Sequence, residues 1–295
     1  MKSNSTARIA FFFLAPALIA IGVFFFIPVV AAFVLSFTDF DIYSLGNWKY
    51  ARLVGIKNYI DLVNDPLFWK ALKNTLYFLF VGGPLSIAMS LATALLLQSK
   101  VVRFKGIFRT AYFAPVVTTL VAVAVVWRFV YHPRFGLLNY ALSFAGIDPI
   151  DWLGDPHWAM PAIILLAVWK NFGYNMIIFI AGLQNIPQEL YEAADIDGAG
   201  KWQQFTAITI PMLAPTTLFI TIITMIGYIQ LFAEPYVMTQ GGPQDATLSI
   251  VLMMYEQGFR WWNMGYSAAV AFILFAIILV ASLIQTWLSR RSRAS

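Results

Sequence analysis

The sequence contains no cysteine and few charged residues, and both shortages limit what the protein can be. Without cysteine it forms no disulfide and offers no thiolate to a metal or a substrate. Charged residues make up 11% of the chain, whereas soluble domains usually carry about 25%. Hydrophobic residues make up 60%. A surface so poor in charge is expected to face lipid, which predicts an integral membrane protein.

Three further absences argue against metal binding, nucleic-acid binding and ATP hydrolysis. The two histidines, His132 and His157, lie far apart in sequence, so no metal site is expected. No stretch of Lys and Arg is dense enough to bind nucleic acid, although the net charge is +5. No G-x4-G-K-[ST] phosphate-binding loop is present, because Trp202 follows Gly200-Lys201. The chain is therefore not expected to hydrolyse ATP, nor to carry a cofactor of its own.

Long apolar runs dominate what is present. A membrane helix needs about 20 mostly apolar residues. The first run is about twice as long as the core of a signal peptide, so we interpret it as a retained helix. Continuous rather than alternating apolarity predicts an all-α integral membrane protein with six transmembrane helices within residues 9–288. The expected spans are 9–37, 74–97, 107–131, 160–182, 212–232 and 267–288.

Basic residues in the short loops predict the orientation. The connector 98–109 holds four basic residues and no acid, and the tail 289–295 holds three and no acid. The first outer loop balances its basic residues with aspartates. We therefore expect a cytoplasmic N-terminus (residues 1–8), a basic cytoplasmic tail and a multi-pass chain.

Residues 183–210 form a polar connector between the fourth and fifth spans, and the same count places it in the cytoplasm. Pro187 is suited to the start of a helix and Gly198 to its end, since glycine accepts a positive φ. A second helix is expected from Lys201 to Ile210. The residues by themselves leave two interpretations open: a docking surface for a partner, or interfacial helices that only join two spans.

The connector carries the pattern Glu192-Ala193-Ala194-x3-Gly198-x9-Ile208-x-Ile210-Pro211, which resembles the EAA motif of ABC importer permeases. The usual Leu before the proline is Ile210 here. Other stretches resemble the permeases of maltose-type carbohydrate importers, and the likeness covers nearly the whole chain. They are Gly55-x2-Asn58-Tyr59, Asp65-Pro66-x-Phe68-Trp69-x-Ala71-x2-Asn74-Thr75, Phe108-Arg109-x5-Pro115, Trp127-Arg128-x7-Gly136-x2-Asn139, Trp169-Lys170-Asn171-x-Gly173-Tyr174 and Tyr236-x2-Thr239-x-Gly241-Gly242-Pro243.

The resemblance implies a type I ABC importer permease fold in the bacterial inner membrane. It implies a second homologous permease subunit and two ATPase subunits, which would be identical and would bind ATP and Mg. It also implies an extracytoplasmic substrate-binding protein that delivers a sugar. In such importers the EAA segment couples the permease to the ATPase. The residues matched here are Glu192, Ala193, Ala194, Asp195, Gly198, Ile208 and Pro211.

The resemblance also implies a substrate pathway along the fourth and fifth spans. The positions that correspond to sugar contacts are Asn171, Tyr174, Thr224, Tyr228 and Leu231, and Gly227 leaves room beside them. An aromatic ring suits the C–H face of a sugar, and amides and hydroxyls suit its polar rim. Ordinary packing between helices is the alternative for both tyrosines.

Lys170 is a charge near the middle of the fourth span, where charges are costly and face a cavity or a partner. Two roles remain open: a place on the pore wall, or an ion pair with a carboxylate such as Glu234 or with the partner subunit.

Two other classes of protein compete with the importer subunit. A stand-alone secondary transporter would need coupling carboxylates within its spans, and none is securely placed there. A membrane-embedded enzyme would need clustered acids at a membrane face, and the tight pair Asp195 and Asp197 belongs to the EAA-like segment.

Overall fold

The computed structural model describes residues 3–46, 51–99 and 101–294, and helices make up most of this part of the chain. An isolated bridge between Thr38 and Leu53 is the one β-type pairing found there. The chain divides into two compact units, Met1–Phe68 with Met253–Ala276 and Trp69–Leu252 with Ile277–Ser295.

In the first unit, α1 (Ser3–Ile21) continues through a π-helical turn, Gly22–Phe26, into α2 (Ile27–Leu35). Next come α3 (Lys57–Asn64), the start of α4 (Pro66–Tyr77), the end of α15 (Ile250–Tyr255) and the start of α16 (Met264–Ala294). The buried Asn58 amide donates to the carbonyl oxygens of Ser36 and Thr38, both at 2.8 Å. Tyr266 Oη donates to Asp65 Oδ2 at 2.9 Å. The Asn58 bonds join α3 to the segment after α2, and the Tyr266 bond joins the end of α3 to α16.

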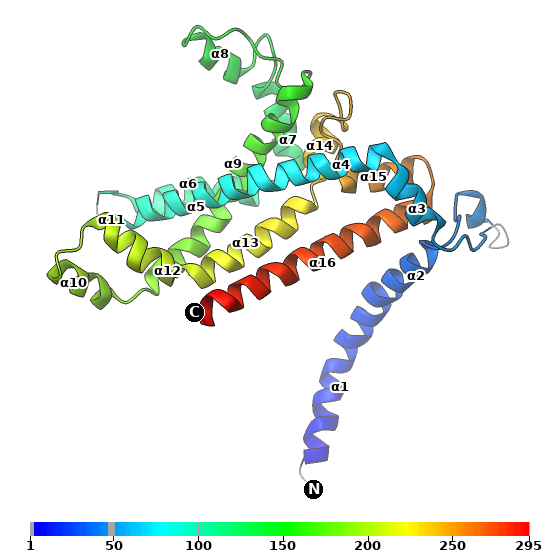
Figure 1. Ribbon diagram of the computed structural model, residues 1–295, viewed down its shortest axis with the longest axis horizontal. Coiled ribbons are helices and arrows are strands. Elements are labelled where there is room, and N and C mark those ends of the chain that lie inside the picture. The colour runs from blue at the N-terminus through cyan, green and yellow to red at the C-terminus, as the bar shows by residue number, and fades with distance from the viewer. Residues whose placement is uncertain (1–2, 47–50, 100, 295) are drawn as a thin grey trace. The chain divides into compact units, whose positions relative to one another are not determined.

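The second unit is built around α9 (Pro156–Gln184), which packs against α5 (Gly83–Gln98), α6 (Lys105–Val117) and α13 (Ala214–Ile229). Figure 1 shows α9 crossing beside α5 and α6. The helix starts at Asp155, whose side chain accepts a hydrogen bond from His157 N, and Pro156 occupies the first turn. Most residues of its middle are buried, as expected for the central helix of a bundle.

Close backbone approach holds α9 against its neighbours. A Cβ built on Gly173 would lie 2.0 Å from the carbonyl oxygen of Tyr112, so only glycine fits at the crossing of α9 and α6. On the other side, Ser90 Oγ of α5 donates to the Phe172 carbonyl oxygen at 2.9 Å. Small residues and interhelical hydrogen bonds are the usual means by which membrane helices pack.

The remaining elements of the second unit are α7 (Leu120–Val130), α8 (Leu137–Ser143), α10 (Gln188–Ile196), α11 (Lys201–Gln204), α12 (Ile210–Met212) and α14 (Ala233–Met238). Asn139 of α8 organises the loop before α9. Its amide donates to the carbonyls of Pro133 and Ile150 at 3.0 and 2.8 Å, and its oxygen accepts from the Trp152 indole at 2.8 Å. This residue of a short family-like motif therefore has a local structural role.

Within the described residues, five helical stretches are long and apolar enough to cross a membrane: Phe11–Leu35, Pro66–Gln98, Pro156–Gln184, Ala214–Met238 and Met264–Trp287. The second begins at Pro66 rather than near residue 74, because Asp65 Oδ1 accepts a hydrogen bond from Leu67 N and α4 runs on without a break into α5. The fourth, Ala214–Met238, includes a non-helical break at residues 230–232, between α13 and α14. The last helix runs on to Ala294, so the predicted tail continues it.

The expected third span is not a single straight helix. Residues 107–131 form most of α6 and α7, which meet at an angle of 101°, so the chain has six spans if this bent pair is one of them. Thr118 and Thr119 have extended backbones with ψ of 149° and 133°, and they interrupt the helix just after Pro115. The backbone carbonyls freed at this break need partners.

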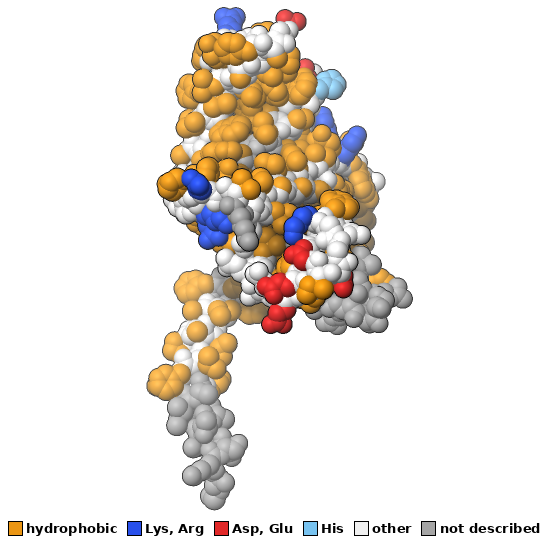
Figure 2. All heavy atoms as spheres, turned by 90° about the vertical axis from the view of Figure 1, so that its left-hand side faces the viewer, with side chains coloured by type: hydrophobic (Ala, Val, Ile, Leu, Met, Phe, Trp, Pro, Cys, Tyr) orange, Lys and Arg blue, Asp and Glu red, His pale blue; other side chains and the backbone are white. Residues whose placement is uncertain are grey.

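Charge and apolarity separate on the surface of the second unit. Figure 2 shows acidic and basic side chains gathered where α10 and α11 lie, with hydrophobic side chains covering the helices beyond them. This separation suits a segment that leaves the lipid for water.

Candidate functional site

The connector between α9 and α13 folds into two helices joined by a tight turn. Pro187 precedes α10, and the turn after this helix has Gly198 at φ 77°, a conformation that strains other residues. The following helix, α11, continues through a π-helical turn, Phe205–Thr209, to α12 and Pro211. The short helices thus lie where the prolines and the glycine of the sequence predict them.

Polar contacts tie the two helices of the connector together. The Gln204 amide donates to Asp195 Oδ1, and Lys201 Nζ lies 3.4 Å from the same oxygen. The hydrogen bond from Gln204, followed by the contacts with Lys201, lowers the pKa of the Asp195 carboxyl below its ordinary value. Tyr191 Oη and Thr209 Oγ1 share a hydrogen bond of 2.8 Å. Asp195 thereby holds the turn that contains Gly198.

One side of the connector is anchored in the core and the other is open. Ile186 is buried in a cluster with residues of α5, α9 and α13, and Ile208 packs against that cluster. Glu192 and Ala193 are exposed, as is Pro211, and Ala194 is half-buried. Two large apolar side chains point outward, since Ile196 is 87% exposed and Trp202 74%.

Lys170 lies where α6 ends. Its Nζ donates to the carbonyl oxygens of Pro115 at 3.0 Å, Val116 at 3.4 Å and Thr118 at 3.1 Å. An ammonium group has three N–H donors, so all of them have acceptors. Lys170 therefore satisfies the carbonyls that the break between α6 and α7 releases. It is not among the residues that line the cavity between α9, α13 and α14. The ion pairs found within 4.0 Å in the described part of the chain do not include Lys170 with Glu234.

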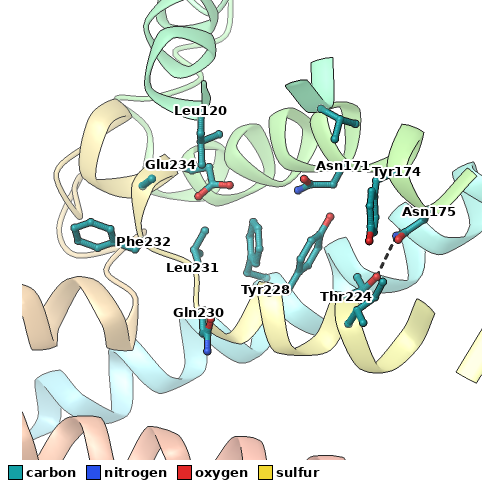
Figure 3. Close-up of a pocket in the computed structure, with 15 residues that line it drawn as sticks. Leu120, Asn171, Tyr174, Asn175, Thr224, Tyr228, Gln230, Leu231, Phe232 and Glu234 are labelled. Atoms are coloured by element: carbon teal, nitrogen blue, oxygen red, sulfur yellow. Dashed lines mark hydrogen bonds between the residues drawn. The ribbon is translucent and has the colours of Figure 1, made fainter. Parts of the chain in front are cut away.

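A cavity of about 420 Å³ lies in the second unit, between α9, α13 and α14. Six of the seven expected pathway residues line it: Asn171, Tyr174, Thr224, Gly227, Tyr228 and Leu231. Figure 3 shows the Tyr228 hydroxyl directed toward Asn171, and the Asn175 amide bonded to Thr224 Oγ1. This volume is in the usual range for small-molecule sites.

The polar groups of this cavity are incompletely paired. The Tyr228 side chain is 5% exposed, and its hydroxyl lies beside Ser86 and Asn171 without a hydrogen bond of acceptable geometry to either. The Ser86 hydroxyl is likewise buried and unbonded. Buried hydroxyls normally find a partner, so a polar ligand or water is expected beside them.

The expected substrate pathway did not include several lining residues: Phe78, Val116, Leu120, Asn175, Ile223, Gln230, Phe232, Ala233 and Glu234. Helical spacing could have found Asn175, which lies four residues after Asn171 and on the same face. Glu234 is an acid at the end of an apolar run, and this pattern indicated only a possible ion pair with Lys170. The break before α14 puts it outside the spacing of α13.

The comparisons with known proteins define the class. Residues 66–294 match the family described as binding-protein-dependent transport system inner membrane component. The chain belongs to this family, which consists of membrane transport proteins rather than enzymes.

Individual relatives show which transport proteins of this family the chain resembles. The chain is 40% identical over 286 residues to the lactose transport system permease protein LacF of Rhizobium radiobacter, which covers 95% of this chain and 94% of that protein. It is 38% identical over 281 residues to the arabinooligosaccharides transport system permease protein AraP of Bacillus subtilis, with 95% and 88% covered. The fold is shared with a solved bacterial alginate ABC transporter in complex with a pentasaccharide-bound periplasmic protein. There the TM-score is 0.85 at 23% identity, with 98% of this chain and 96% of that one covered.

Proposed function

We propose that this chain is the permease subunit of an ATP-driven importer that moves a sugar or sugar derivative across the bacterial cytoplasmic membrane. The cavity between α9, α13 and α14 is the observation that carries the proposal, because it gathers aromatic, amide and hydroxyl groups from separate helices. Relatives named for lactose and for arabinooligosaccharides support a carbohydrate as the cargo.

The substrate pathway in this proposal runs past Asn171, Tyr174, Thr224, Tyr228 and Leu231, beside Gly227. The rings of Tyr174 and Tyr228 stack on the C–H face of a sugar, while the Asn171 amide and the Tyr228 hydroxyl bind its hydroxyl groups. Lys170 acts from behind this wall by holding the end of α6.

The connector is the coupling element of the proposal. Its anchored side moves with α9 and α13, and its open side, with Glu192, Ala193 and Gly198, docks on an ATPase subunit. Two such subunits, an identical pair, bind ATP and Mg. A second permease subunit completes the pore, and a binding protein delivers the sugar from outside. Both termini and the connector face the cytoplasm, as the basic loops favour.

Purification and reconstitution test this function. We expect the chain to co-purify with a second permease and an ATPase, and a sugar-loaded binding protein to stimulate ATP hydrolysis by the reconstituted complex. The chain alone in liposomes is expected to transport nothing. Transport of a sugar by the chain alone would overturn the proposal and favour a secondary transporter.

A further inference from the structure

Glu234 is a buried carboxylate at the wall of the cavity. Its side chain is 8% exposed, and the segment between α13 and α14 positions it opposite α9. Figure 3 shows its carboxylate directed into the space that the Asn171 amide and the Tyr228 hydroxyl also face. A buried carboxylate is costly unless other groups compensate its charge and donate hydrogen bonds to it.

Lys170 offsets only part of the cost of burying the Glu234 charge, and it donates no hydrogen bond to this carboxylate. The two groups interact electrostatically, yet the three N–H donors of Lys170 already bond to the carbonyls of Pro115, Val116 and Thr118. The Glu234 carboxylate has about four acceptor positions. Among the described residues, no side chain is found to donate a hydrogen bond to this carboxylate. Most of its acceptor capacity therefore faces the cavity.

We propose that Glu234 determines substrate specificity: its carboxylate accepts hydrogen bonds from the hydroxyl groups of a neutral sugar and excludes acidic sugars and phosphate esters. This inference rests on the proposed function and specifies its substrate class. A sugar hydroxyl can both donate and accept a hydrogen bond. One sugar can therefore donate to the Glu234 carboxylate and also bond with the Tyr228 hydroxyl, which has no partner in the structure. The anionic group of an acidic sugar or phosphate ester offers only acceptors and is repelled by the carboxylate.

The fold alone leaves this question open. A solved ABC transporter with the same fold is involved in the import of the acidic polysaccharide alginate. The charge of the cavity, rather than the architecture, is what separates neutral from acidic cargo.

The first arm of the test compares the uptake of neutral and acidic sugars. The complete importer is expressed in bacteria that lack other carbohydrate importers, and the cells receive two probe sets: neutral di- to tetrasaccharides and uronate-containing oligosaccharides of the same lengths. Mass spectrometry measures what accumulates. We expect only neutral sugars. Accumulation of uronate oligosaccharides would overturn the role of Glu234 and leave the import function standing, whereas uptake of neither set contradicts the proposed function itself.

The second arm isolates the permease, because the binding protein also selects substrates. Glu234→Gln keeps the shape and removes the charge. We expect the neutral-sugar uptake rate per assembled complex to fall about tenfold or more, the factor for one charge-assisted hydrogen bond. Glu256→Gln is the matched control, since Glu256 pairs with Arg260 outside the cavity, and it is expected to import at the wild-type rate.

Assembly is measured for each variant by co-purification with the partner subunits. Glu234→Asp keeps the charge that balances Lys170 but withdraws the carboxylate by one methylene group. We expect normal assembly and an uptake rate between those of Glu234→Gln and the wild type. If Glu234→Asp or Glu234→Gln imports at the wild-type rate per complex, Glu234 does not contact the substrate and the proposal is wrong.

Discussion

Lys170 Nζ lies 3.0 Å from the carbonyl oxygen of Pro115 and so joins the middle of α9 to the end of α6. The same ammonium reaches the carbonyls of Val116 and Thr118 across the 101° bend between α6 and α7. A cation at the C-terminus of a helix also interacts favourably with the helix dipole. The charge in the fourth span is thus explained by the break in the third.

Replacing Lys170 with Met leaves these carbonyls without their donor. We expect the free energy of unfolding to fall by about 1–3 kcal/mol, the cost of leaving buried polar groups unbonded. Lys170→Gln, which keeps two donors, is expected to lie between Met and the wild type. The thermal unfolding midpoints of the purified proteins in detergent measure this order of stability. Lys57→Met, at an exposed position, is the control, and a Lys170→Met midpoint equal to it would contradict this role.

Gly173 offers a test of the crossing between α9 and α6. An alanine Cβ would lie 2.0 Å from the Tyr112 carbonyl oxygen, so the two helices must separate. We expect Gly173→Ala to lower the free energy of unfolding by about 1–3 kcal/mol or more, as overpacking does. Gly227→Ala is the matched control, because its Cβ would meet nothing within 4 Å. Equal thermal midpoints of the two variants would show that α6 and α9 do not cross this closely.

Substitutions at Gly198 distinguish two roles of the connector turn: a backbone conformation that favours glycine, and a surface on which a partner docks closely. Its φ of 77° favours glycine or asparagine, and a Cβ there would meet nothing within 4 Å in this chain. If only backbone strain at residue 198 matters, the Gly198→Asn variant would couple ATP hydrolysis to transport better than the Gly198→Ala variant. If the docking surface lies close, the smaller Ala would couple better.

We expect Ala to retain more sugar-stimulated ATPase activity than Asn in the reconstituted complex. We also expect Gly198→Asp to abolish transport while membrane insertion stays normal. Wild-type coupling in Gly198→Asp would argue against a docked turn.

Asp195 makes the connector sensitive to acid. The Gln204 hydrogen bond and the Lys201 contacts lower the pKa of its carboxyl, so the ionised form is favoured in the folded state. Its stabilising contribution is fully present above the ordinary value of 3.8 and is lost as the pH falls through the lowered pKa. NMR titration of labelled Asp195 measures the shift, and Gln204→Ala is expected to move the pKa back up. An unchanged pKa in Gln204→Ala would remove Gln204 as the main cause.

Some of this architecture was predictable because its causes are local. The apolar runs predict membrane helices, since each residue's transfer into lipid depends mainly on its own side chain. Pro187 and Gly198 predict where α10 begins and ends, because a fixed φ and a positive φ are properties of single residues. The break after Pro115 could not be predicted in the same way, because Thr118 and Thr119 occur readily within long apolar helices.

The cavity depends on relationships that are not local. Residues 171–175, 224–231 and 234 come together only because α9 packs on α13 and the chain bends before α14. The apolar sequence by itself determined that this protein crosses the membrane, and its motifs indicated the transport family. Only the tertiary structure decided that Lys170 holds a helix end and that Glu234 faces the cavity. Hydrogen-bond partners and charge compensation depend on distances between helices, which no single segment of the sequence contains.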